Sequence, residues 1–293
     1  MTLLSGWGAN KRADCSLTEP EQPEQVARWL DPAGTVPRGL GRSYGDAAIN
    51  DGGRVIGMTR VNRFLGFDDT TGTLVCEAGV SLADILGTYA PRGWFPAVSP
   101  GTKFVTVGGC IANDIHGKGH HAHGCFSACV DRMTVLLASG DVVTASRTEN
   151  PDLFWATFGG MGLLGVVLTA TLRLRKVETT YFRQKVIKAN SLEAMLAVLD
   201  ENDHAFPYSV ATLDVFARGA RLGRGVVAVG DHAALAELPP RLAGNPLRVS
   251  GGPKINVPFD LPEITLNPLS MRVGNAVILG IQTMGGELGH YEG

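Results

Sequence analysis

The chain has 293 residues, of which 44% are hydrophobic, and its formal net charge is -2. Such a chain is long enough for two domains, and its charge argues against a partner nucleic acid held by a basic surface alone. No run of about 18 apolar residues could span a bilayer, and the N-terminus lacks an apolar secretory region, so we expect a cytoplasmic protein. The 38 glycines and 16 prolines predict many tight turns and short strands in a mixed α and β fold.

The first predicted element is a short helix over 19–30, with an inward face that includes Val26 and Trp29. A very short strand, Thr35-Val36, follows. The next elements are predicted strands at 55–58, 64–68 and 73–78 in one small sheet, a helix from Ser81 to about Pro91 that begins with a capping box, and an extended segment at 94–98.

Further along, the pattern predicts a short helix over 107–113, a hairpin of 132–137 and 141–145, a helix over 151–158 and a strand over 166–174. Between the last two elements, Gly160-Met161-Gly162-Leu163-Leu164-Gly165 satisfies G-x-G-x-x-G. The Rossmann fingerprint needs a strand before this motif and a helix after it, whereas here a helix precedes and a strand follows. The sequence therefore disfavours a Rossmann site.

Beyond Lys176, long proline-rich connections separate the predicted elements. We therefore predict a second domain with an open sheet, so that the domains are 1–176 and 177–293. The pattern gives no assignment to 249–266, and 277–293 form no recognisable closing element after a strand-like run. The elements predicted in this domain are strands at 181–187 and 209–216 and helices at 192–201 and about 232–238.

The stretch Pro37-Arg38-Gly39-Leu40-Gly41-Arg42-Ser43-Tyr44-Gly45-Asp46, here called the anion loop, follows the short strand. Its glycines permit positive φ and let peptide N–H groups turn around one centre, and its two arginines add positive charge. The natural guest is a phosphate or pyrophosphate. A surface turn between two strands is the competing interpretation.

A second glycine-rich region runs from Pro100 to Phe126. In it, a short helix starting at Val107 would direct N–H groups at its N-terminus, supplied partly by Gly108 and Gly109, toward a negative or carbonyl-bearing ligand. The sequence therefore predicts two glycine-rich anion loops.

Histidine and cysteine side chains crowd the end of this region. Structural zinc usually shows two well separated ligand pairs, so we predict no metal, with a zinc module kept as an alternative. A flavin- or sugar-binding role for His116 and Lys118 is favoured, because a cation near the pyrimidine ring stabilises reduced flavin. Tyr44 could pack in the core or stack on a cofactor ring. The potential metal ligands are His116, His120, His121, His123, Cys125 and Cys129, and all five cysteines are expected to be reduced.

Three segments resemble one known pattern: 36–46, 100–121 with its His116-Gly117-Lys118-Gly119-His120-His121, and 153–165. They are similar to the PCMH-type FAD-binding oxidoreductase family, which includes vanillyl-alcohol oxidase and the sugar-lactone oxidases. Within it, the chain most resembles the branch that oxidises decaprenylphosphoryl-ribose. Most of the residues that match the family lie before about residue 175, and few lie after it.

The resemblance implies an α+β fold, with a PCMH-type FAD-binding domain of two α+β subdomains and then an incomplete substrate domain with an antiparallel sheet. It implies non-covalent FAD, because Arg42 stands where many relatives have the histidine that tethers the cofactor. Tyr44, His116 and Lys118 would line the flavin and substrate end as catalytic residues, with Lys118 as candidate base. The residues implied to contact FAD are Arg38, Gly39, Leu40, Gly41, Arg42, Ser43, Tyr44, Gly45, Asp46, Gly101, Thr106, Val107, Gly108, Gly109, His116 and Val167.

The activity that the resemblance implies is oxidation of a secondary hydroxyl of a sugar. A polyprenyl-phosphate sugar would be the substrate, with peripheral membrane contact through its lipid and a partner reductase as further expectations. Family members continue beyond this length, so we expect a fragment or a truncated product whose activity is in doubt. The alternatives are a non-catalytic FAD-binding module and a sugar-lactone oxidase acting on a substrate such as arabinono-1,4-lactone.

Overall fold

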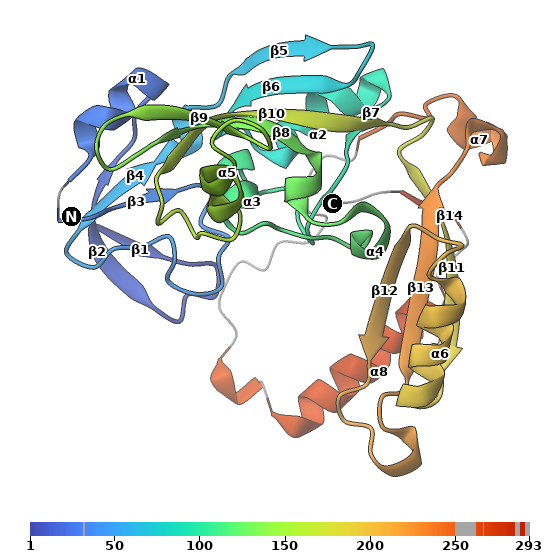
Figure 1. Cartoon of the computed structure of the whole chain (residues 1–293). Helices are drawn as coiled ribbons and strands as arrows, with labels where there is room; N and C mark the ends of the chain where they lie inside the picture. The colour runs from blue at the N-terminus through green and yellow to red at the C-terminus, as the bar shows by residue number, and fades with distance from the viewer. Residues whose placement is uncertain (32, 250–261, 266, 285–287, 291–293) are drawn as a thin grey trace. The chain divides into compact units, whose positions relative to one another are not determined.

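A computed structural model describes residues 1–31, 33–249, 262–265, 267–284 and 288–290 (Figure 1). The chain forms two compact units, Met1–Lys176 and Val177–Glu292. Both mix helices with sheets, which confirms the predicted α+β class. Among the described residues, no helix has the length and apolar character needed to cross a membrane.

The first sheet of the N-terminal unit has four strands in the order β1-β2-β4-β3. β1 is antiparallel to β2, whereas β2 and β3 both run parallel to β4. The hairpin of β1 and β2 was missed, because only the small residues Ala13 and Cys15 mark its buried face. The strands are β1 (Thr2–Ser5), β2 (Arg12–Thr18), β3 (Thr35–Arg38) and β4 (Arg54–Gly57).

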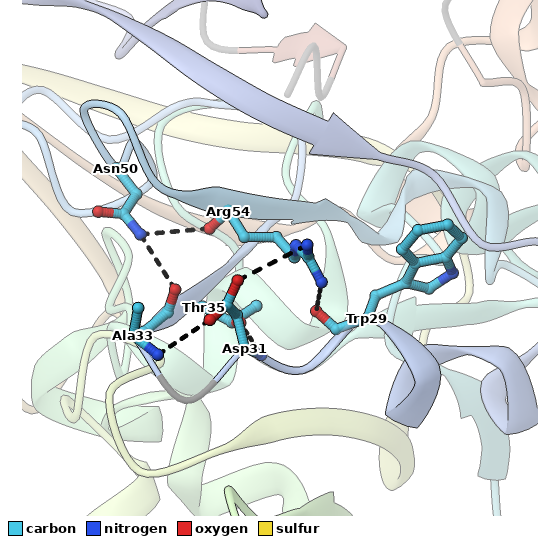
Figure 2. Close-up of polar contacts among 7 residues, drawn as sticks. Trp29, Asp31, Ala33, Thr35, Asn50 and Arg54 are labelled. Carbon is cyan, nitrogen blue, oxygen red and sulfur yellow. Dashed lines mark hydrogen bonds and ion pairs between the residues drawn. The ribbon is translucent and has the colours of Figure 1, made fainter.

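Polar contacts join the turn before β3 to the start of β4 (Figure 2). The Asp31 carboxylate accepts the Ala33 N–H at 2.9 Å and lies 3.6 Å from the Arg54 guanidinium. The Asp31 N–H donates to the Thr35 hydroxyl at 2.9 Å, and the Asn50 amide donates to the Arg54 carbonyl at 3.3 Å. These contacts fasten the chain on both sides of the anion loop.

The second sheet of this unit is antiparallel, in the order β5-β6-β10-β8-β9, with β7 also paired to β10. The prediction that β4 shares a sheet with β5 and β6 is wrong, because a 3₁₀ turn at Met58–Arg60 separates them and β4 pairs with β2 and β3 instead. The strands are β5 (Phe64–Asp68), β6 (Thr73–Glu77), β7 (Trp94–Pro96), β8 (Val130–Leu136), β9 (Val142–Ser146) and β10 (Val166–Lys176).

The helices of this unit are short. The predicted capping box is confirmed, since the Ser81 hydroxyl accepts the Asp84 N–H and the Asp84 carboxylate accepts the Ser81 N–H. The first helix is shorter than predicted, and Trp29 is 40% exposed, because a 3₁₀ turn follows Val26 and rotates Trp29 outward. The helices are α1 (Pro23–Val26), α2 (Leu82–Tyr89), α3 (Val107–Ala112), α4 (His120–His123) and α5 (Pro151–Thr157).

An apolar cluster joins the two sheets of the N-terminal unit. It contains Ile56 of β4, Leu136 of β8 and Val166 and Leu168 of β10, all nearly inaccessible to water. A larger core packs the second sheet against α2 and α3. The anion loop begins in the last two residues of β3 and leads toward β4. The G-x-G-x-x-G segment lies between α5 and β10, which confirms the helix-before, strand-after context.

The C-terminal unit holds an antiparallel sheet in the order β12-β13-β11-β14 (Figure 1). Helix α6 (Leu192–Asn202) packs on it through Met195, which shares one buried apolar cluster with Ala189, Val227 and Val229. The predicted strand at 181–187 and helix at 192–201 are confirmed. The strands are β11 (Tyr181–Ala189), β12 (Tyr208–Leu213), β13 (Gly225–His232) and β14 (Leu288–His290).

Other expectations for this unit are wrong. The predicted helix at about 232–238 is absent, because β13 extends to His232 and leaves room only for a 3₁₀ turn at Leu235–Glu237 and for α7 (Pro240–Ala243). The strand-like run near Val277 lies inside α8 (Pro268–Met284). Most of the unassigned stretch 249–266, namely 250–261 and 266, and the terminal 291–293 lie outside the described residues.

Asp214 joins the end of β12 to β13 and α8. Its carboxylate accepts the Phe216 N–H at 3.0 Å, the Asn275 amide at 2.7 Å and two bonds from Arg224 at 2.9 and 2.7 Å. The hydrogen bonds from Arg224 lower the pKa of Asp214 below its ordinary value.

Replacing Asp214 with asparagine is therefore expected to lower the free energy of unfolding at pH 7 by about 1–3 kcal/mol. Because the folded pKa lies below the unfolded value of about 3.9, this stabilisation is complete above that pH and disappears as the pH falls through the folded pKa. Urea unfolding should show a gap between wild type and Asp214→Asn at pH 7 that shrinks at pH 3. Exposed Asp200→Asn is the control, and a gap that is equal at both pH values would contradict the assignment.

Candidate functional site

A pocket opens in the N-terminal unit beside Pro37 of β3 and Val167 of β10, one strand from each of its two sheets. Three segments that are distant in sequence border it: the anion loop with the residues after it, the start of α3, and the turn before β10. The lining residues are Pro37, Ser43, Ala47, Ala48, Met58, Ala78, Thr106, Gly108, Gly109, Ala112, Asn113, Met161, Gly162, Gly165 and Val167.

The anion loop carries a run of backbone donors that have no partner among the residues the structure describes. In the described part of the chain, no N–H from Leu40 to Gly45 donates a hydrogen bond to another residue. Gly41 takes φ +66, a conformation that glycine adopts at little cost. Backbone N–H groups need an acceptor, which must come from water or a ligand. This donor set fits the phosphate oxygens of a nucleotide cofactor.

The N-terminus of α3 does not have the donor role that the sequence predicted. The N–H groups of Val107–Gly109 donate, in order, to the Val80 carbonyl at 2.8 Å, the Ala78 carbonyl at 2.8 Å and the Thr106 hydroxyl at 3.2 Å. The reason is a bridge between Ser81 and Thr106, which holds this segment beside β6 and α2. Its glycines instead keep the pocket wall free of side chains.

Two arginines brace the anion loop. The Arg38 guanidinium donates to the carbonyls of Ser5 at 2.8 Å and Ala48 at 3.0 Å, and its burial lowers the pKa of Arg38. The Arg42 Nε donates to the Phe104 carbonyl at 3.2 Å and so ties the loop to the segment before α3. Both predicted positive charges are present, but their guanidinium groups bind backbone carbonyls of the protein and so fix the shape of the loop.

Arg38→Ala is expected to destabilise the N-terminal unit by about 1–3 kcal/mol, because two carbonyls lose a charged donor. Arg38→Lys should recover part of this loss, since an ammonium can reach one carbonyl but cannot fork to both. Thermal unfolding of the two variants measures the difference. Equal melting temperatures for wild type and Arg38→Ala would contradict the bracing role.

Several predicted site residues do not line the pocket. Tyr44 is 75% exposed and meets the Trp7 ring edge-on, with 5.4 Å between centroids. His116 and Lys118 are exposed, and the His116 ring lies 5.4 Å from that of His120. Of the predicted cofactor contacts, the pocket gathers Ser43, Thr106, Gly108, Gly109 and Val167 and leaves out Arg38, Gly39, Leu40, Gly41, Arg42, Tyr44, Gly45, Asp46, Gly101, Val107 and His116.

Sequence reasoning missed the turn before β10 as part of the site. Gly162 takes φ +78, and a Cβ there would lie 2.9 Å from the Pro37 ring. The Met161 N–H donates to the Ala112 carbonyl at 2.8 Å. The G-x-G-x-x-G spacing was the available signal. Its glycines serve close packing against the anion loop and α3, which is a different role from that in a Rossmann turn.

The histidine and cysteine cluster does not assemble a metal centre. Among the described residues, no group of three or more His, Cys, Asp or Glu side chains is placed to hold an ion. The Cys125 sulfur lies 3.8 Å from the His120 Nδ1, while the Cys129 thiol donates to the Phe126 carbonyl. Burial raises the pKa of Cys129 to about 12, which opposes the thiolate that zinc requires.

Comparison with known proteins gives a consistent picture. The profile of a family described as FAD binding domain matches residues 17–146. Decaprenylphosphoryl-beta-D-ribose oxidase of Mycolicibacterium smegmatis is 38% identical over 274 residues, covering 90% of this chain and 57% of that protein. L-gulonolactone oxidase of Mus musculus is 35% identical over 135 residues, covering 46% of this chain and 30% of that protein. D-lactate dehydrogenase of Anaerostipes hadrus is 33% identical over 135 residues, covering 44% of this chain and 28% of that protein. The chain thus spans less than two thirds of each of these relatives.

Proposed function

Because this chain belongs to the PCMH-type FAD-binding oxidoreductases, we propose that it binds FAD non-covalently and uses it to oxidise a secondary hydroxyl of a sugar to a ketone. The observation that carries the proposal is the run of N–H groups from Leu40 to Gly45, which lies beside the pocket and has no acceptor in the described part of the chain. A pyrophosphate offers acceptor oxygens to several such donors at once. The pocket wall is correspondingly lined by glycines and other small residues.

Two features support a removable cofactor. Arg42, at the position where many family members carry the tethering histidine, has no nucleophilic atom with which to attack the flavin. Two of the buried cysteines, Cys76 and Cys129, also lack the thiolate character that such attachment needs, since burial raises the pKa of each to about 12.

Bound FAD would supply the hydride acceptor for the oxidation. The hydroxyl group must lose its proton to a base as its carbon loses the hydride, so that the products are a ketone and reduced flavin. We assign the base to Lys118 and the orientation of the substrate to His116 and Tyr44. All three side chains are exposed, so a substrate can reach them.

The proposed substrate is a polyprenyl-phosphate pentose, on the strength of the 38% identity to an oxidase named for decaprenylphosphoryl-ribose. A lipid of this kind would bring the protein into peripheral contact with a membrane, and a partner reductase would reoxidise the flavin. The L-gulonolactone oxidase match supports a sugar lactone as the alternative substrate.

Anaerobic reduction of the bound flavin tests the activity. The protein loaded with FAD is mixed with a polyprenylphosphoryl-ribose or with a sugar lactone, and the visible flavin absorption is followed. We expect bleaching with the lipid-linked ribose, whereas bleaching with the lactone alone would select the alternative substrate. Tight FAD binding without bleaching by either compound would show a non-catalytic FAD-binding module instead.

A further inference from the structure

The turn between β1 and β2, residues 6–11 and here called the N-terminal turn, packs against the anion loop. The Trp7 N–H donates to the Ser43 carbonyl at 2.8 Å. The Lys11 ammonium lies 2.7 Å from the Asp46 carboxylate, and this hydrogen bond lowers the pKa of Asp46. Several contacts, made by residues more than 30 positions apart in the chain, thus join the two segments.

Glycines let the two backbones approach closely. A Cβ on Gly6 would lie 2.4 Å from the Gly45 carbonyl oxygen and 2.6 Å from that of Ser43, closer than real Cβ contacts allow. A Cβ on Gly8 would lie 3.0 Å from the Tyr44 carbonyl oxygen. The approach therefore involves three consecutive carbonyls of the anion loop.

These carbonyls point toward the N-terminal turn. At Gly45 the oxygen lies 2.4 Å and the carbonyl carbon 3.5 Å from the Gly6 Cβ position, and at Tyr44 the values from Gly8 are 3.0 and 3.9 Å. In both cases the difference approaches the C=O bond length of about 1.2 Å, so each bond is directed at the turn.

Peptide planarity then fixes the direction of the next N–H groups. In a trans peptide the N–H points opposite to the preceding C=O. The Ser43 carbonyl also faces the N-terminal turn, because it accepts the Trp7 N–H. The N–H groups that follow the Ser43 and Tyr44 carbonyls, those of Tyr44 and Gly45, must therefore point away from the turn, and neither has an acceptor among the described residues. Successive N–H groups that point the same way form an anion-binding concavity.

We infer that the N-terminal turn is a positioning element of the cofactor site: by holding the carbonyls of Ser43, Tyr44 and Gly45 on its own side, it directs the Tyr44 and Gly45 N–H groups at a phosphate of the dinucleotide. This inference rests on the proposed function, since it requires that FAD be the ligand. Gly6 and Gly8 would act through the carbonyls of the loop.

Comparing FAD with riboflavin tests this role, because riboflavin lacks both phosphates. The affinities of the flavin-free full chain and of Gly6→Ala for each ligand are measured by flavin fluorescence. We expect Gly6→Ala to weaken FAD binding about tenfold or more, the loss of one charge-assisted hydrogen bond, and to leave riboflavin binding nearly unchanged. A general destabilisation would weaken both ligands alike.

Gly52→Ala is the matched control, because Gly52 takes φ +70 next to the same sheet and a Cβ there meets no atom within 4 Å. It should lower the melting temperature without changing the ratio of FAD to riboflavin affinity. If Gly6→Ala does not fold, the same measurements are made on Gly8→Ala. This substitution is milder, because the Tyr44 carbonyl has to move by only a few tenths of an ångström to accommodate the new Cβ.

The outcomes separate the two claims. Equal FAD affinity in wild type and Gly6→Ala, or in wild type and Gly8→Ala when only that variant folds, would overturn the positioning role and leave the proposed function intact. A wild-type protein that binds neither flavin would overturn both.

Discussion

Gly39→Ala is expected to cost about 1–3 kcal/mol of unfolding free energy and to weaken FAD binding by about tenfold or more. A Cβ at Gly39 would lie 2.2 Å from the Thr106 hydroxyl oxygen and 3.2 Å from the Thr106 Cβ and Cγ2. The anion loop and the start of α3 would have to separate, and the pocket lies between them. Chemical unfolding and FAD titration measure the two effects.

A second substitution at Thr106 shows whether this contact is the cause. Thr106→Ala alone should cost about 1 kcal/mol, because the Thr106 hydroxyl caps α3 by accepting the Gly109 N–H. Added to Gly39→Ala it should be much less harmful than the sum of the single changes, since it removes the clashing oxygen. Thr106→Ser keeps that oxygen, so adding it to Gly39→Ala should not restore stability or FAD affinity. Strictly additive losses would contradict the close approach.

Lys118→Met is expected to bind FAD as wild type does and to slow anaerobic flavin reduction by about 10²–10⁴-fold, the usual contribution of a general base. The physical reason is that methionine keeps the length of the side chain but has no basic nitrogen. Lys118→Arg is the matched control, because arginine keeps the positive charge yet does not release its proton near neutral pH.

The two variants separate the roles that a lysine can play. If Lys118 acts as the base, both variants should be slow. If only its charge matters, Lys118→Arg should keep most of the rate. Reduction at the wild-type rate in Lys118→Met would remove Lys118 from the mechanism and leave FAD binding unaffected.

The sequence predicted elements well where the signals are local. The capping box at Ser81 and Asp84 marks the start of α2, and the helix before and strand after G-x-G-x-x-G were expected. Helix α8 was missed because its β-branched residues favour a strand. Its start did carry a signal, since Pro268 occupies the first turn and the Asn267 side chain accepts the N–H groups of Leu269 and Ser270.

The site was harder to predict because pairings between distant segments decide it. The glycines of α3 looked like anion donors, but the Gly108 N–H donates to the Ala78 carbonyl just after β6, a partner that no local pattern reveals, and the Gly109 N–H donates to the Thr106 hydroxyl. The arginines of the anion loop were expected to face an anion, whereas the Arg38 guanidinium donates hydrogen bonds to the carbonyls of Ser5 and Ala48. The anion loop itself was recognisable because its glycine spacing expresses a backbone requirement, which is local.

An absorption spectrum of the purified protein, before and after acid precipitation, tests the central claim most directly. Among the described residues, the N–H groups from Leu40 to Gly45 have no acceptor, and Arg42 stands where a tethering histidine would be. We therefore predict a yellow protein, or one that turns yellow when FAD is added, whose flavin passes entirely into the acid supernatant. A colourless protein that does not bind added FAD would contradict the account, and flavin that stays in the pellet would contradict its non-covalent attachment.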